Sequence, residues 1–257
     1  MAIQENPYLP PSSRVADAIA PDGNYIEGGR AVPVGHSASW IGTGWRIFRR
    51  QIGVWILLAI VFALILLALF VVPILGQFAV TLLMPVFVAG MMTGSRKVEA
   101  GEDLELADLF AGFRRNTGAL LLVGLIGFGL TMAVLIPAML LTGAGAVLTA
   151  MVGGTPEAAG AGVLVGFLGF FALVIPINMA IWFAPALVMF HEQPAPRAML
   201  QSFRGCLKNL VPFLLYGLIL FVLAIFASIP FGLGWFALGP VVVGSVYAAY
   251  RDIYTER

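Results

Sequence analysis

Residues 45–72 read WRIFRRQIGVWILLAIVFALILLALFVV, a cluster of basic and aromatic residues followed by a long apolar run. A transmembrane helix needs about 20 consecutive apolar residues, and the run that starts at Ile52 supplies them without any Asp, Glu, Lys or Arg. A backbone inside a bilayer must satisfy its own hydrogen bonds, so we expect an α-helix here. The stretch indicates a chain that spans a membrane.

The whole chain has the composition of a membrane protein. Of its 257 residues, 60% are hydrophobic and 11% are charged, which is too little polar surface for a soluble domain of this size. Stretches without Asp, Glu, Lys or Arg extend over residues 51–95, 116–156, 158–191 and 209–250. We predict an all-α integral membrane protein with six transmembrane helices, at about 52–72, 77–94, 117–141, 163–190, 210–229 and 235–250.

The positions of the basic residues predict the topology. All 14 Lys and Arg residues lie in four segments, at 1–50, 96–115, 197–208 and 251–257. Basic segments beside membrane spans stay in the cytoplasm, so we expect both termini on the cytoplasmic side of a bacterial inner membrane. We expect a mostly irregular N-terminal tail over 1–36, a membrane domain over 37–250 and a short cytoplasmic tail over 251–257.

A unit that joins a basic-aromatic segment to an apolar hairpin occurs three times in the chain. The basic-aromatic segments are residues 45–50, 110–115 and 203–208. We predict that each belongs to a cytoplasmic amphipathic helix at the membrane interface, and that the spans pair as three hairpins. The second arm of each hairpin carries a proline that is expected to kink its helix, namely Pro85, Pro185 or Pro240. The middle hairpin is longer because of a Gly- and Ala-rich region at 142–165, which we expect to project outward or to lengthen its helices.

The N-terminal tail contains a short proline-rich motif. Residues 6–11 read NPYLPP, which favours extended or polyproline geometry. The pattern Asn-Pro-Tyr-x-x-Pro resembles tags that precede several unrelated bacterial membrane domains. It implies a docking or sorting role, so we expect that a protein partner could bind through the tail.

Three short motifs resemble those of a group of membrane proteins. They are Phe-His-Glu-Gln-Pro at 190–194, Ser-Phe at 202–203 and Lys-Asn-Leu-Val-Pro-Phe at 208–213. Over residues 37–250 the chain resembles a family of uncharacterised proteobacterial inner-membrane proteins, and more distantly the membrane domain found beside some glycerophosphodiester phosphodiesterases. The resemblance implies a six-helix membrane fold without an assigned activity, and it carries no catalytic residues.

Residues suited to catalysis or metal binding are scarce in the sequence. The two histidines, His36 and His191, lie on different segments, and Cys206 is the single cysteine. Zinc needs three or four placed ligands, and a nucleophile needs a neighbouring base. Ser228 and Ser245 lie in a charge-free stretch that offers no such base. We therefore expect no metal, no cofactor and no enzymatic activity.

Polar residues within the predicted spans define an alternative function. A site formed by Gln77, Asn178 and the helices kinked at Pro85, Pro185 and Pro240 would make the protein a small-molecule or lipid transporter. Ion-coupled transporters usually carry ionisable residues at mid-membrane depth, and the predicted spans contain none. The simpler role for the two amides is to satisfy nearby backbone groups.

The basic-aromatic segments are the favoured functional surface. We predict a cytoplasmic ring that binds anionic membrane lipids or a partner protein, formed by Trp45, Arg49, Arg50, Arg114, Arg115, Arg204 and Lys208. Each Lys or Arg near an anionic leaflet contributes about 1 kcal/mol of attraction, although such residues also serve simply as topology signals and anchors. Nucleic acid is not an expected ligand, because acidic residues such as Glu102 and Asp103 lie on the same side. The sequence thus predicts a non-enzymatic inner-membrane protein that organises lipid or assists a partner complex, with transport as the alternative.

Overall fold

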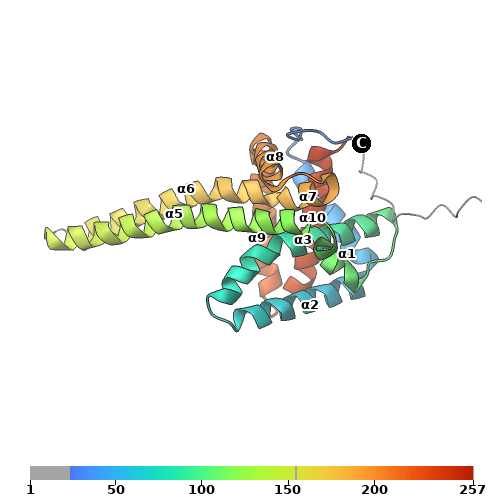
Figure 1. The fold of residues 1–257 in the computed structure, drawn as a ribbon, viewed down its shortest axis with the longest axis horizontal. Helices are drawn as coiled ribbons and strands as arrows, with labels where there is room; N and C mark the ends of the chain where they lie inside the picture. Colours follow the sequence, from blue (N-terminus) through green and yellow to red (C-terminus); the bar gives the residue numbers. More distant parts are fainter. Residues whose placement is uncertain (1–23, 154, 257) are drawn as a thin grey trace, which may run out of the picture.

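The computed structural model describes residues 24–153 and 155–256, and the regular elements of these residues are helices (Figure 1). In chain order they are α1 (His36–Arg50), α2 (Ile52–Phe70), α3 (Leu75–Ala100), the 3-10 helix η1 (Leu106–Phe110), α4 (Ala111–Arg114), α5 (Thr117–Met151), α6 (Pro156–Trp182), α7 (Ala184–His191), α8 (Ala195–Lys208), α9 (Leu210–Ser228) and α10 (Trp235–Tyr254). The proline-rich motif at 6–11 and most of the expected irregular tail lie outside the described residues.

Five helical stretches of the described chain are long and apolar enough to cross a membrane. They are Ile52–Phe70, Leu75–Ala100, Thr117–Gly145, Gly160–His191 and Leu210–Ser228. The sixth predicted span falls in α10, which is not in this group. Gly244 and Ser245 interrupt the apolar character of α10, and Arg251 and Asp252 add charge to its last turn. Gly244, Ser245 and Asp252 are buried against the protein, so they do not meet lipid in this fold.

Helices α5 and α6 form a long arm that extends away from the other helices (Figure 1). The 35 residues of α5 correspond to a length of about 52 Å, which exceeds the roughly 30 Å thickness of a bilayer's hydrocarbon core. The Gly- and Ala-rich region at 142–165 contributes the end of α5 and the start of α6. It therefore lengthens both helices.

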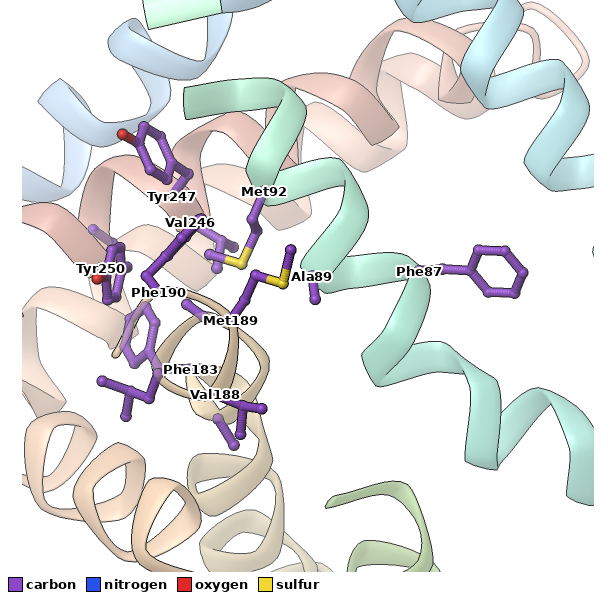
Figure 2. Close-up of a cluster of buried hydrophobic side chains, with 14 of the residues drawn as sticks. Phe87, Ala89, Met92, Phe183, Val188, Met189, Phe190, Val246, Tyr247 and Tyr250 are labelled. Carbon is purple, nitrogen blue, oxygen red and sulfur yellow. The ribbon is translucent and has the colours of Figure 1, made fainter. Parts of the chain in front are cut away.

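The buried core lies where α3, α7 and α10 meet. Figure 2 shows Met92, Met189 and Val246 pointing toward one another from these three helices, with Phe190 and Tyr250 beside them. Met92 and Met189 are 0% and 2% exposed. Phe87 leaves the opposite side of α3 and packs against other aromatic rings. Helix α7 is apolar on all sides because protein surrounds it.

The segment expected as a C-terminal tail, residues 251–257, begins as the last turn of a helix. Helix α10 continues to Tyr254, and the side chains of Asp252, Ile253 and Tyr254 are buried. The segment before α1 covers this end: the Ile26 amide donates to the Tyr254 carbonyl at 2.8 Å, and the Arg30 amide donates to the Ile253 carbonyl at 2.9 Å. The two ends of the described chain thus pair with each other, because the orphan carbonyls of the last helical turn need donors.

The amphipathic helix expected around residues 110–115 is also not a continuous α-helix. It is a 3-10 helix followed by a single α-helical turn. This segment approaches α3 so closely that a Cβ atom on Gly112 would lie 2.3 Å from the Val86 carbonyl oxygen. The backbones of η1 and α4 therefore lie in close contact with α3.

Candidate functional site

An open cavity of about 640 Å³ lies between α3, α5, α6 and α10. Its lining includes four residues of the alternative site that the sequence analysis put forward, namely Gln77, Asn178, Pro85 and Pro185. These residues come from α3, α6 and the start of α7, so only the packing of the helices brings them together. The third predicted kink residue, Pro240, is buried inside α10 and does not line the cavity.

The cavity follows one face of each helix. On α3 the lining residues recur with helical spacing, at Gln77, Val80, Thr81, Met84, Pro85, Val88 and Met92. On α5 they are Gly124, Gly127, Phe128, Thr131 and Met132. The two glycines set how closely α5 approaches α3 and α6. A Cβ atom on Gly124 would lie 2.8 Å from the Leu82 carbonyl oxygen of α3, and one on Gly127 would lie 2.6 Å from the Ile181 side chain of α6.

The polar groups around the cavity are few and are mostly bonded within their own helices. The Thr81 hydroxyl donates to the Gln77 carbonyl at 3.0 Å, and the Thr131 hydroxyl donates to the Gly127 carbonyl at 2.8 Å. The Asn178 side-chain amide donates to the Val174 carbonyl at 3.0 Å. Such bonds leave a wall that is dominated by apolar side chains, which suits an apolar molecule with one or two polar groups.

The buried core closes one end of the cavity. Met92 and Val246 line the cavity and also belong to the cluster in Figure 2. From Gln77 to Met92 the cavity follows α3 for 15 residues, or about 22 Å. It is therefore an elongated space with a packed end.

The two prolines at the cavity have different effects on their helices. Pro85 lies inside α3, whereas Pro185 lies in the first turn of α7, after a break at Phe183. The hydroxyl of Ser202 on α8 closes this break, because it accepts from the Phe183 amide at 2.9 Å and donates to the Met179 carbonyl at 2.7 Å. The break between α6 and α7 is thus held by hydrogen bonds.

A second apolar cavity of about 420 Å³ lies between α6, α8 and α9. Asn178 and Trp182 line both cavities, so α6 separates them. Cys206 borders the second cavity, and burial raises the pKa of its thiol to about 12. The thiol is therefore protonated near neutral pH and is not a nucleophile.

The predicted basic ring is only partly available to an external ligand. Arg50 donates to the Val98 carbonyl at 2.8 Å, Arg115 pairs with Glu192 at 2.6 Å, and Lys208 donates to the Gly29 carbonyl at 2.7 Å. The other four predicted residues are exposed on the surface, namely Trp45, Arg49, Arg114 and Arg204.

Each histidine is held by the last turns of α10. The His36 Nδ1 atom lies 2.6 Å from the Asp252 carboxylate, and the His191 Nε2 atom lies 2.6 Å from the Tyr250 hydroxyl. No group of three or more His, Cys, Asp or Glu that could hold a metal occurs among the residues described. The histidines therefore join segments of the fold.

Sequence reasoning missed the α5 side of the cavity. The small residues Gly124, Gly127 and Thr131 recur at helical spacing, which is a readable pattern for a face that packs closely or borders a space. The same pattern also occurs on ordinary packed faces of membrane helices. Only the positions of α3 and α6 decide that this face borders a cavity.

Comparisons with known proteins place the chain in a family. No family model matches it, and no solved structure matches it. A protein of Burkholderia thailandensis that bears the name "Probable inner membrane protein" is 30% identical over 219 residues. The matched region is 81% of this chain and 79% of that protein. The chain therefore belongs to the family of this Burkholderia inner membrane protein.

Proposed function

We propose that the protein is a non-enzymatic inner-membrane protein that binds a lipid-like molecule in the cavity between α3, α5 and α6. The observation that carries the proposal is the single apolar space lined by both in-membrane amides and two of the predicted prolines. Its length of about 22 Å along α3 exceeds the roughly 15 Å hydrocarbon depth of one leaflet, so an extended acyl chain fits. The sequence analysis expected the basic segments to bind lipid; this proposal places lipid binding in the cavity instead.

The chemistry of the lining favours binding over bond-breaking. No Asp, Glu, His, Lys, Arg or Cys belongs to the described lining of this cavity, so it offers no general acid or base. The same absence of charge speaks against coupling to an ion. Gln77 and Asn178 can hydrogen-bond a headgroup or carbonyl of the bound molecule. The distant resemblance to a membrane domain that accompanies glycerophosphodiester phosphodiesterases is in keeping with a lipid ligand.

Transport of the same kind of molecule is the second candidate. The observation in its favour is that Asn178 and Trp182 line spaces on both sides of α6. Transport would require these two spaces to connect across α6. Movement of a labelled lipid between the leaflets of vesicles that contain the protein would separate transport from binding.

The proposal includes six membrane crossings with both termini in the cytoplasm. Contacts between the chain ends support this count: Tyr25 pairs with Thr255, and Arg30 bonds to Asp252 at 3.2 Å. Segments in contact outside the bilayer lie on the same side of it, so an even number of crossings separates them. The five apolar stretches and α10 together provide that even number.

Filling the cavity tests the proposal. The variant Thr131→Trp places a large ring in the space between α5 and α3, and the matched control Leu130→Trp places the same ring on the neighbouring exposed position of α5. Native mass spectrometry of protein extracted in a mild detergent should detect bound lipid on the wild type and on Leu130→Trp. We expect at least about a tenfold loss of bound lipid on Thr131→Trp, because an occupied site cannot hold the chain.

A second substitution and a measurement of folding distinguish a filled cavity from a misfolded protein. Val88→Trp fills the same cavity from α3, and the thermal unfolding temperature of each variant reports its folding. If folded Thr131→Trp and Val88→Trp both retain as much lipid as the wild type, the cavity is not the binding site.

A further inference from the structure

We propose that a polar crevice between α1 and α10 binds a phosphate group. The crevice has a volume of about 340 Å³, and its lining comprises Ser39, Trp40, Thr43, Arg46, Glu99, Ala248 and Arg251. It shares no residue with the apolar cavity. On α10 the cavity residues Val242 and Val246 lie on one face, and Ala248 and Arg251 lie on roughly the opposite face.

The crevice is built on a rigid helix pair. Ser39, Thr43 and Arg46 recur at helical spacing and so share one face of α1. Gly44, on the same helix, lies so close to α10 that an added Cβ atom would be 2.3 Å from the Val241 carbonyl oxygen. Backbone contact therefore fixes α1 against α10, and the crevice-lining groups of both helices are held in place.

The charges in the crevice favour an anion. Arg251 and Glu99 form an ion pair with each other, which cancels their charges. The Arg46 guanidinium is exposed and donates to the Thr43 hydroxyl at 3.1 Å. A guanidinium has five N–H donors in a planar fork that matches phosphate oxygens, so this bond leaves donors for a ligand. The crevice thus carries one net positive charge at Arg46.

One hydroxyl group completes the phosphate site, that of Thr43, because the Ser39 hydroxyl donates to the His36 carbonyl at 2.8 Å. The Thr43 oxygen accepts the bond from Arg46, which leaves the hydroxyl hydrogen of Thr43 for an anionic oxygen. Trp40 donates its indole N–H to Asp252 at 3.0 Å, so only its ring lines the crevice. The oxygens of a phosphate group can accept from a bidentate arginine and from a hydroxyl donor together. The source of the phosphate is either a lipid headgroup or a soluble phosphate.

Two arginines on α1 give a matched test. Arg46 lines the crevice, and Arg49 lies one turn later on the same helix, is also exposed and does not line the crevice. The variants Arg46→Ala and Arg49→Ala therefore remove the same charge from the same helix. Isothermal titration of the full-length protein in a neutral detergent would use two probes, inorganic phosphate and dihexanoyl phosphatidylglycerol.

We expect Arg46→Ala to weaken binding by at least about tenfold, because a hydrogen-bonded charge pair is lost, and Arg49→Ala to change it by less than about twofold. Thr43→Val should weaken binding by about fivefold through the loss of one hydroxyl donor. Binding of both probes, or of inorganic phosphate alone, supports the site and assigns it to phosphate in general. Binding of the lipid probe alone supports the site and assigns it to a headgroup.

The proposal is overturned if neither probe binds the wild-type protein, or if Arg46→Ala and Arg49→Ala weaken binding equally. Thermal unfolding of each variant shows that the folded protein is being compared. The lipid-cavity variants Thr131→Trp and Leu130→Trp should leave phosphate binding unchanged, so failure of the cavity proposal and failure of this one are distinguishable.

Discussion

The Asp252 carboxylate accepts hydrogen bonds from three side chains near the end of α10. Its side chain is 2% exposed, and its carboxylate receives the Trp40 indole N–H at 3.0 Å, the His36 ring at 2.6 Å and the Arg30 guanidinium at 3.2 Å. Burial by itself raises the pKa of this carboxyl group, but the hydrogen bonds from Trp40, His36 and Arg30, together with the charge of His36, outweigh burial. The pKa of Asp252 therefore lies below its usual value.

The depressed pKa predicts the pH range over which Asp252 stabilises the fold. The ionised carboxylate contributes its full stability above the unfolded-state pKa of about 3.9, and the contribution is lost as the pH falls through the lower folded-state value. We expect Asp252→Asn to lower the free energy of unfolding at pH 7 by about 1.5–3 kcal/mol, because hydrogen bonds to a charge are lost. Thermal unfolding in detergent at pH 7 measures this change, with exposed Glu102→Gln as the control. Equal unfolding temperatures for the two variants would contradict the role of Asp252.

Among elements, the crossing of α1 and α10 depends on two glycines. The Gly44 and Gly244 backbones meet at the crossing: a Cβ atom on Gly244 would lie 3.0 Å from the Gly44 Cα atom. A Cβ atom on Gly44 would lie 2.3 Å from the Val241 carbonyl oxygen and 2.7 Å from the Ser245 amide nitrogen. These neighbours are backbone atoms, which cannot rotate away as a side chain can.

The crossing predicts different effects of the same substitution at two positions of α1. Gly44→Ala should destabilise the protein by about 1–3 kcal/mol through overpacking. Gly42→Ala adds a methyl group where no atom lies within 4 Å, so it should be neutral or stabilise the helix by up to about 1 kcal/mol. Both variants change helix propensity in the same way. The difference between their thermal unfolding temperatures therefore reports the packing at the crossing. A Gly44→Ala protein as stable as Gly42→Ala would mean that α1 does not pack on α10 this closely.

At the scale of the whole molecule, the proposal states on which side of the membrane each segment lies. The proposed six crossings place the turn between α5 and α6 outside and the C-terminus inside the cell. The single native cysteine, Cys206, is buried, so it should react slowly with thiol reagents. Cysteines introduced at chosen positions can therefore report their side of the membrane.

We expect Thr155→Cys to react with a membrane-impermeant maleimide in intact spheroplasts, because Thr155 lies between α5 and α6. Glu256→Cys should react only after the membrane is opened, since residue 256 follows the end of α10. The wild-type chain serves as the background control. Labelling of Glu256→Cys in intact spheroplasts would contradict the cytoplasmic C-terminus, and labelling of both cysteines there would be incompatible with six crossings.

Membrane insertion and helical structure are properties that the sequence determined by itself. Long runs without charge cannot be solvated in water, and a backbone in lipid must form its hydrogen bonds within each helix. These requirements act locally, so composition and the positions of the arginines were enough to predict an all-helical membrane chain. The Burkholderia relative and the apolar helices agree with that part of the prediction.

The tertiary structure decided which of the possible sites exist. Gln77 and Asn178, which the sequence offered only as an alternative site, border one cavity because α3 and α6 both pack against α5, and no local pattern specifies that packing. The same holds for the basic residues: Arg50 and Lys208 bond to backbone carbonyls of distant segments, whereas Arg46 faces a crevice. It also holds for the C-terminal end, which is buried because residues 24–35 cover it. Contacts between residues far apart in the chain depend on helix lengths, breaks and crossing glycines acting together, and the amino-acid pattern of a single segment does not contain that information.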